Sequence, residues 1–209
     1  MQWIRRAACV LAWLAVMAAG QTAAPLIIAF GDSLTAGAGV PPSASYPADL
    51  ARLMARAHSP YRVVNKGVSG DTTTDALQRL PAIITLHPRW VILEFGGNDG
   101  LRGLPLATTR AHLQSMIVAL QKAGIHILLV GMTLPPNYGA PYVRSFQNIF
   151  PSLAAQDHIP LLPVLYQDLI PRLRADPGLL QDDGIHASVR GNAVVAVTVW
   201  NALRPLLKK

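Results

Sequence analysis

The sequence predicts an α/β fold in which a mostly parallel sheet carries helices on both faces. Three observations support this prediction. Short runs rich in branched apolar residues, such as 26–30 and 90–95, have the length and composition of buried strands. Segments with apolar residues at helical spacing alternate with these runs along the chain. No repeat, linker or low-complexity stretch divides the sequence, so one domain contains the whole alternation.

The expected elements follow one another in the order that a parallel sheet requires. Pro47 opens the first expected helix, because a residue without an N–H is tolerated in the first turn. Gly124 ends the third helix, and Ser188 can cap the last one, which runs to about Leu203. The expected strands are 26–30, 61–64, 90–95, 125–130 and a short one, interrupted by prolines, within 159–164. The expected helices are 47–57, 75–85, 108–123, 142–156 and 188–203.

The first twenty residues have the pattern of a secretory signal peptide. Two arginines precede an uncharged stretch, 7–19, and the small residues Ala18 and Gly20 occupy suitable −3 and −1 cleavage positions. The apolar run is shorter than the roughly 20 residues of a membrane-spanning helix, so cleavage is favoured over a membrane anchor. We therefore expect a signal peptide at 1–20, a single domain at 21–209, and a periplasmic or secreted mature protein.

Composition excludes several classes of protein. With 14% charged and 51% apolar residues, the chain is expected to fold rather than to be disordered. The lone cysteine, Cys9, lies in the expected signal peptide, so the mature chain has no disulfide, thiol nucleophile or thiolate metal site. Loss of two arginines with the signal peptide lowers the net charge from +7 to +5, and the remaining basic residues are scattered. The sequence therefore indicates no nucleic-acid partner.

A serine and a histidine lie where hydrolytic chemistry would need them. Gly31 ends the first expected strand, and Ser33 follows in the sequence Gly-Asp-Ser-Leu, at the edge where open α/β sheets bind ligands. A serine becomes a nucleophile if a base reaches it. His186, about 150 residues later, is the only histidine with an acid, Asp183, three residues before it. Asp182 is a rival acid. This order of residues predicts a serine hydrolase.

Four blocks of sequence, in this order, resemble those of the SGNH (GDSL-type) hydrolases. Besides Gly-Asp-Ser-Leu they read Asn-Lys-Gly-Val-Ser-Gly-Asp-Thr-Thr at 65–73, Glu-Phe-Gly-Gly-Asn-Asp at 94–99, and Asp-Gly-Ile-His at 183–186. The family is marked by one Ser, Gly, Asn and His, each in its own block. The matching positions here are Ser33, Gly70, Asn98 and His186. The resemblance covers nearly all of the mature chain and is particularly close to periplasmic esterases of the family.

This resemblance implies a fold and a set of roles. The fold would be the flavodoxin-like three-layer α/β/α sandwich of SGNH hydrolases, working without a metal or other cofactor. Asp183, rather than its neighbour, would complete a catalytic triad with Ser33 and His186. The backbone amides of Ser33 and Gly70 and the side-chain amide of Asn98 would form an oxyanion hole.

One residue departs from the family pattern. Many members carry a proline directly after the catalytic histidine, whereas this chain has Ala187. Proline fixes φ near −65°, so its replacement is expected to loosen the loop around His186, although it removes no catalytic group.

The substrate groove is expected to be largely apolar. Two glycines, at 100 and 103, bracket a Leu-Arg pair, as in a movable loop that lines a cleft. The candidate substrate-binding residues are Leu101, Arg102, Leu104, Leu134, Pro135 and Tyr138. The resemblance implies small acyl substrates, which include aryl and alkyl esters, acyl-CoA thioesters and lysophospholipids, and the sequence does not rank them. We expect a monomer without stable membrane insertion after signal cleavage.

Two alternatives belong to different classes. A carbohydrate O-acetyl esterase of the same family would need a shallow polar cleft, whereas the expected loops are apolar. A non-enzymatic lipid-binding module on a degenerate hydrolase scaffold should have lost a triad or oxyanion-hole residue, and none is missing.

Overall fold

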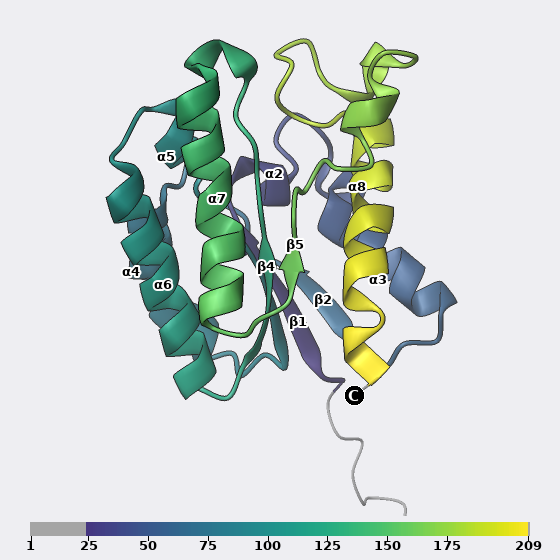
Figure 1. Ribbon diagram of the computed structural model, residues 1–209. Helices are drawn as coiled ribbons and strands as arrows, with labels where there is room; N and C mark the ends of the chain where they lie inside the picture. Colours follow the sequence, from purple (N-terminus) through teal and green to yellow (C-terminus); the bar gives the residue numbers. More distant parts are fainter. Residues whose placement is uncertain (1–23, 209) are drawn as a thin grey trace, which may run out of the picture.

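Five parallel strands form the centre of the protein (Figure 1). The computed structural model describes residues 24–208, so the expected signal peptide at 1–20 lies outside the described residues. Along the sheet the strand order is β2-β1-β3-β4-β5, which is that of flavodoxin-like folds. The prediction of fold class is therefore confirmed. The strands are β1 (Leu26–Gly31), β2 (Arg62–Asn65), β3 (Trp90–Glu94), β4 (His126–Val130) and β5 (Leu161–Leu162).

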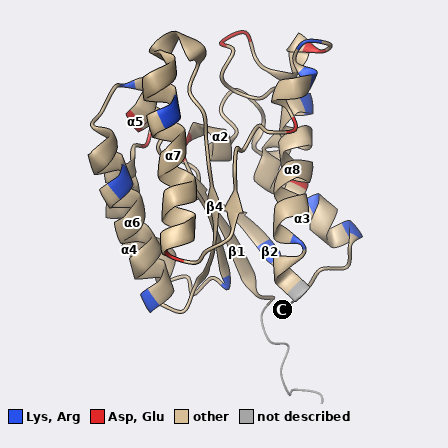
Figure 2. Cartoon of the chain, in the orientation of Figure 1, with Lys and Arg blue, Asp and Glu red and all other residues tan. Residues whose placement is uncertain are grey.

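Helices cover both faces of the sheet and complete the three layers. On one face α3 (Tyr46–Arg56) packs against α8 (Val189–Leu203), seen at the right of Figure 1. The other face carries α4 (Thr73–Ile84), α6 (Leu106–Lys122) and α7 (Ala140–Gln156). Lysines and arginines are spread over several of these helices in the view of Figure 2. No helix in the described part of the chain is long and apolar enough to cross a membrane.

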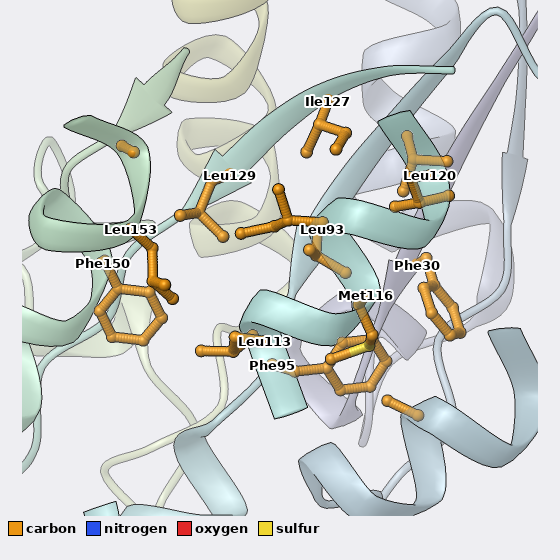
Figure 3. Close-up of a cluster of buried hydrophobic side chains, with 14 of the residues drawn as sticks. Phe30, Leu93, Phe95, Leu113, Met116, Leu120, Ile127, Leu129, Phe150 and Leu153 are labelled. Atoms are coloured by element: carbon orange, nitrogen blue, oxygen red, sulfur yellow. The ribbon is translucent and has the colours of Figure 1, made fainter. Parts of the chain in front are cut away.

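Alternation along the strands builds two separate cores. In β1, Ile28 and Phe30 face α4, α6 and α7, whereas Ile27 and Ala29 face α3 and α8. The other central strands alternate in the same way, because successive side chains of a strand point to opposite faces. Figure 3 shows the first core, in which phenylalanines and leucines of the helices close over the strands. A strand buried on both faces is expected to be apolar, and β3 is so except at its last residue, Glu94.

Several helices begin two residues before their expected starts. The helix α4 begins at Thr73 because Thr72 and Asp75 form a reciprocal capping box, in which Thr72 N–H donates to the Asp75 carboxylate at 2.9 Å. In α7 the proline at position 141 lies in the first turn, where the missing N–H is tolerated, and α6 begins directly after its N-cap residue, Pro105. Two helices of one turn, α2 (Ser33–Ala36) and α5 (Gly97–Leu101), were not predicted, because they are too short to show helical periodicity.

The topology places the candidate residues at one edge of the sheet. Strands β1 and β3 are neighbours, although the chain passes through β2 between them. Their carboxyl ends therefore meet at the switch point of the sheet, where doubly wound folds bind ligands. The short helices α2 and α5 start directly after these two strands and carry Ser33 and Asn98.

Candidate active site

Ser33 is the first residue of α2 and is fixed by its neighbours. The Asp32 carboxylate caps the helix by accepting a hydrogen bond from the N–H of Leu34 at 3.0 Å. Gly31 has no room for a side chain, because a Cβ there would collide with Thr35 and with the Glu94 carboxylate. The sharp passage from strand to helix therefore leaves the Ser33 hydroxyl at the wall of a cavity.

His186 and Asp183 form a hydrogen-bonded line with Ser33. His186 Nε2 lies 2.9 Å from Ser33 Oγ, and His186 Nδ1 lies 2.6 Å from Asp183 Oδ2. The other Asp183 oxygen accepts the N–H groups of Ile185 and His186, each at 2.9 Å. Desolvation raises the pKa of Asp183, but these hydrogen bonds outweigh it and lower the pKa to about 2. Asp183 is therefore a carboxylate at neutral pH, able to orient the imidazole.

The loop that carries His186 is held by bonds on both sides of Ala187. The Ala187 carbonyl accepts hydrogen bonds from the side chains of Gln181 and Asn192, at 2.9 and 3.0 Å. The Ala187 N–H donates to the Tyr166 hydroxyl at 3.1 Å. A proline, the residue that many family members carry here, has no N–H and could not make this last bond. The bond from Ala187 to Tyr166 therefore opposes the expected loosening of the loop.

Asn98 projects from α5 toward the nucleophile segment. Its Nδ2 donates to Asp32 Oδ2 at 3.1 Å and to the Asp71 carbonyl at 2.9 Å. Gly70, which precedes Asp71, has a φ of +87°, a conformation that favours glycine. Its carbonyl accepts a hydrogen bond from Arg102 at 2.9 Å. The loop after β2 is therefore joined to the loop after β3 through the side-chain amide of Asn98.

Two buried carboxyl groups lie behind the nucleophile. Burial is the main cause that raises the pKa of Asp32 to about 6, against the hydrogen bonds that it accepts. Glu94 is fully buried, and burial together with the charge of Asp32 raises its pKa well above the ordinary range. One Glu94 oxygen accepts from the Thr35 hydroxyl at 2.6 Å and from the Asp32 N–H at 3.3 Å. Its other oxygen has no partner among the described residues.

A cavity of about 1020 Å³ opens beside Ser33, Asn98 and His186. Three of the predicted substrate-binding residues, Leu101, Leu134 and Pro135, line it. The other three predicted residues lie outside its lining. Arg102 binds the Gly70 carbonyl, the Tyr138 hydroxyl donates to the Leu101 carbonyl at 2.8 Å, and Leu104 is 36% exposed.

The opposite wall of the cavity was not predicted. It comes from the irregular segment between β5 and the His186 loop, with Tyr166, Ile170 and Leu173, and from Val143 and Gln147 of α7. The irregular segment has no periodic pattern that would show which side chains face inward. Most of the wall is apolar, which suits a hydrocarbon chain more than a sugar. Within the described residues, no group of His, Cys, Asp or Glu could hold a metal ion.

Comparison with known proteins gives the family. The model of the GDSL-like Lipase/Acylhydrolase family matches residues 29–194. Esterase TesA of Pseudomonas aeruginosa is 37% identical over 193 residues, which are 92% of this chain and 94% of that protein. Thioesterase 1/protease 1/lysophospholipase L1 of Escherichia coli is 38% identical over 186 residues, covering 88% of this chain and 86% of that protein. A crystal structure of TesA matches with a TM-score of 0.81 at 36% identity, covering 87% of this chain and 99% of that one.

The matched residues 29–194 contain all four sequence blocks, and the similarities confirm the resemblance to SGNH hydrolases. The chain belongs to the GDSL-like lipase/acylhydrolase family, the SGNH hydrolases.

Proposed function

We propose that this protein hydrolyses carboxylic esters and acyl thioesters through an acyl-enzyme formed on Ser33. The observation that carries the proposal is the continuous hydrogen-bonded line from Ser33 through His186 to Asp183, which opens on an apolar cavity. A nucleophile, a base and an acid that orients the base are the groups that acyl transfer requires. Two relatives carry the names esterase and thioesterase/lysophospholipase, which agree with this chemistry.

In the first half of the reaction, Ser33 Oγ attacks the substrate carbonyl carbon while its proton passes to His186 Nε2. The Asp183 carboxylate stabilises the imidazolium that forms. The tetrahedral intermediate collapses when His186 gives the proton to the departing alcohol or thiol, which leaves an acyl ester on Ser33. Water then attacks this ester with His186 again as the base, and the acid is released.

The developing oxyanion would be held by the backbone N–H groups of Ser33 and Gly70 and by Nδ2 of Asn98. In the free protein the two N–H bonds of that amide point to Asp32 and Asp71. An oxyanion therefore has to share one of these two hydrogens with its present acceptor. The two acceptors also fix the orientation of the Asn98 side chain before the substrate binds. Such preorganisation is what makes a fixed donor effective in a transition state.

The cavity favours acyl chains over acetyl groups on sugars. Its walls are mostly hydrocarbon, and its volume of about 1020 Å³ exceeds what an acetyl group needs. A carbohydrate O-acetyl esterase would gain little from such walls. A lipid-binding module without catalysis would have no use for the Ser33–His186 contact at 2.9 Å.

The test is a series of p-nitrophenyl esters from acetyl to palmitoyl, with acyl-CoA substrates assayed in parallel. We expect turnover of both classes, with kcat/KM rising beyond the acetyl ester. Ser33→Ala should stay folded and lose roughly 10⁴- to 10⁶-fold in kcat. Near-normal turnover by Ser33→Ala would end the proposal. A preference for acetyl groups would favour the carbohydrate esterase instead.

We also propose a location and an assembly state for the protein. We expect cleavage after Gly20, a periplasmic or secreted mature enzyme, and a monomer. Mass spectrometry of the protein recovered from a periplasmic extract should give a chain that begins at Gln21, and light scattering should give the mass of one mature chain. A chain retained in the membrane with its first residues intact would contradict this part.

A further inference from the structure

Three loops at the carboxyl edge of the sheet supply the proposed oxyanion donors. Ser33 follows β1, Gly70 follows β2, and Asn98 follows β3. The loops are separate in sequence, and their relative positions must be fixed to a fraction of an ångström, because a small misplacement of a catalytic group costs a large factor in rate. The three loops therefore need a common point of attachment outside the cavity.

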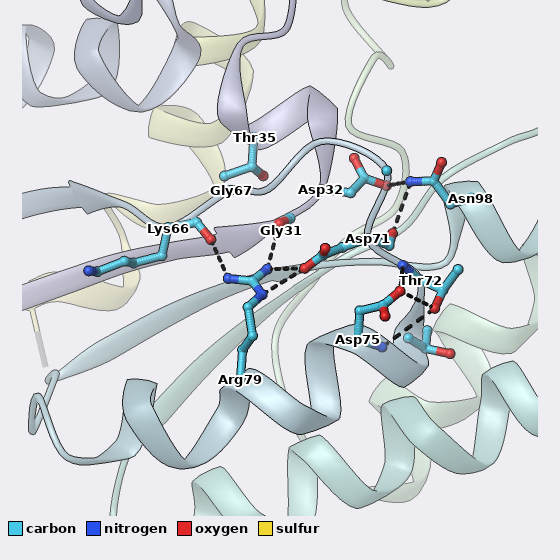
Figure 4. A network of polar contacts seen from close by, with 12 residues as sticks. Gly31, Asp32, Thr35, Lys66, Gly67, Asp71, Thr72, Asp75, Arg79 and Asn98 are labelled. Carbon is cyan, nitrogen blue, oxygen red and sulfur yellow. Dashed lines mark hydrogen bonds and ion pairs between the residues drawn. The ribbon is translucent and has the colours of Figure 1, made fainter.

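Arg79, in the second half of α4, contacts the first two of these loops (Figure 4). Its Nη2 donates to the carbonyl of Gly31 at 3.3 Å, and its Nη1 donates to the carbonyl of Lys66 at 2.9 Å. Its Nε donates to the Asp71 carboxylate at 2.6 Å. An arginine can make these bonds together because its donors form a rigid planar fork, whereas a lysine offers a single charged point.

Asp71 extends this attachment to the third loop. Its carboxylate binds Arg79, while its carbonyl accepts the hydrogen bond from Asn98 Nδ2 at 2.9 Å. Asp71 also follows Gly70 directly. The bond to Arg79 therefore fixes the residue next to the proposed donor Gly70, and the same residue accepts the hydrogen bond of the proposed donor Asn98. The Asp71 side chain is 13% exposed and that of Arg79 is 28% exposed, so water screens this ion pair only in part.

Aromatic rings hold the guanidinium group from the other side. Its central carbon lies 4.8 Å from the ring centre of Phe30 and 5.8 Å from that of Phe95. These two rings pack edge to face at 4.7 Å, at the ends of β1 and β3. A cation over aromatic faces is stabilised by the ring quadrupoles. Arg79 is therefore fixed by the same two strands whose loops carry Ser33 and Asn98.

From this geometry we infer that Arg79 is a positioning residue of the oxyanion hole, which acts through Asp71 on Gly70 and Asn98. The inference rests on the proposed function. Arg79 is not among the residues that line the cavity, so it does not touch the substrate. Its effect should therefore fall on stabilisation of the transition state and not on binding of the ground state.

The experiment compares Arg79→Met and Arg79→Lys with Arg52→Met. Methionine keeps an apolar stem over the two phenylalanines but removes all donors, and lysine keeps the charge without the fork. Arg52 is a matched control, because it also binds a carboxylate and a carbonyl, those of Asp49 and Ser43, but on the exposed side of α3. All variants are assayed on a p-nitrophenyl ester well below their melting temperatures, and rates are corrected for the folded fraction.

We expect Arg79→Met to lower kcat by about 10- to 10²-fold with little change in KM, since one or two donors are displaced but not deleted. The kcat of Arg79→Lys should lie between those of Arg79→Met and the wild type, and Arg52→Met should keep the wild-type kcat. The pH at which activity is half-maximal should stay the same in all of them, because the contact of His186 with Asp183 is untouched. A normal kcat in Arg79→Met, or a loss carried by KM, would overturn the inference.

A double variant separates positioning from general loosening. If Arg79 acts through the hole, then Arg79→Met in an Asn98→Ala background should cost less than the same change in the wild type. Equal losses in both backgrounds would overturn the inference, because they would show that Arg79 does not act through Asn98. Failure of the proposed function has a different signature, because the wild type itself would then turn over no faster than Ser33→Ala.

Discussion

Two adjacent aspartates in the last loop have different surroundings. Both residues are exposed, but among the described residues only Asp183 contacts the imidazole of His186, at 2.6 Å, and it also accepts two backbone N–H groups. Residue type does not distinguish them. Only the resemblance to the family indicated which acid turns toward the histidine. In the structure the chain turns at Gly184, which has a φ of +68°, and the Asp183 carboxylate contacts the imidazole.

We expect Asp183→Asn to lower kcat by up to about 10⁴-fold. The amide oxygen can still accept the two backbone N–H groups, so its NH₂ would face Nδ1 of His186 and impose the wrong tautomer. Asp182→Asn is the matched control and should keep nearly all activity. The measurement is kcat for one ester with the two variants side by side. If Asp182→Asn is the more damaged variant, the assignment of the acid is wrong.

At the scale of elements, the strands were predicted better than the loops. The central strands are apolar along most of their length because they are buried on both faces, so β1, β3 and β4 are visible in the sequence. The starts of α4, α6 and α7 were predicted two residues late, because a start depends on local geometry such as the Thr72–Asp75 capping box of α4. The wall of the cavity formed by Tyr166, Ile170 and Leu173 has no regular element longer than the 3-10 turn Ile170–Arg172, so only tertiary packing decides which of its side chains face inward.

The His186 loop gives a prediction at this scale. Tyr166→Phe leaves the N–H of Ala187, which is only 5% exposed, without its acceptor, and should lower the free energy of unfolding by about 1–3 kcal/mol. In an Ala187→Pro background residue 187 has no N–H group. There Tyr166→Phe should lower the free energy of unfolding by clearly less than it does with Ala187. The antiparallel bridge of this loop uses the N–H groups of Gln181 and Ser188, so a proline between them breaks no bridge bond.

Urea unfolding of the wild type, the two single variants and the double variant measures this coupling. Phenylalanine keeps the ring, and any change in its packing against the cavity is the same in both backgrounds and cancels. Equal costs of Tyr166→Phe with alanine and with proline at position 187 would mean that the bond does not hold the loop.

The fold and part of the active site follow from one rule. Parallel strands place all their carboxyl ends at one edge, so a serine after β1 and an asparagine after β3 must come close when these strands are neighbours. The strand order itself and the return of His186 to that edge depend on long-range packing, which no local pattern encodes. The sequence pointed to them only through resemblance to a family.

The same edge buries a carboxyl group that should make stability depend on pH. Glu94 is fully buried, one of its oxygens has no hydrogen-bond partner in the part of the chain that the structure describes, and burial raises its pKa well above the ordinary range. An unfolded chain releases a glutamate proton near pH 4.3, while the folded chain keeps it. Because the native state then binds more protons than the unfolded state, stability falls as pH rises above about 4.3, by at most about 1.4 kcal/mol per pH unit.

Glu94→Gln removes the titratable group and keeps the shape of the side chain. The stability of this variant should therefore fall less between pH 5 and pH 8 than that of the wild type. Asp32, whose pKa is raised to about 6, adds a loss of the same sign in both proteins. Asp183, with its pKa lowered to about 2, contributes below this range. The comparison therefore isolates Glu94. The stability of Glu94→Gln at a single pH is not compared with that of the wild type, because the glutamine amide places an unpaired N–H donor at the position of the unpartnered Glu94 oxygen and is destabilising for that reason alone. Urea unfolding at each pH gives the two slopes, and parallel curves would show that Glu94 ionises alike in the folded and unfolded chains.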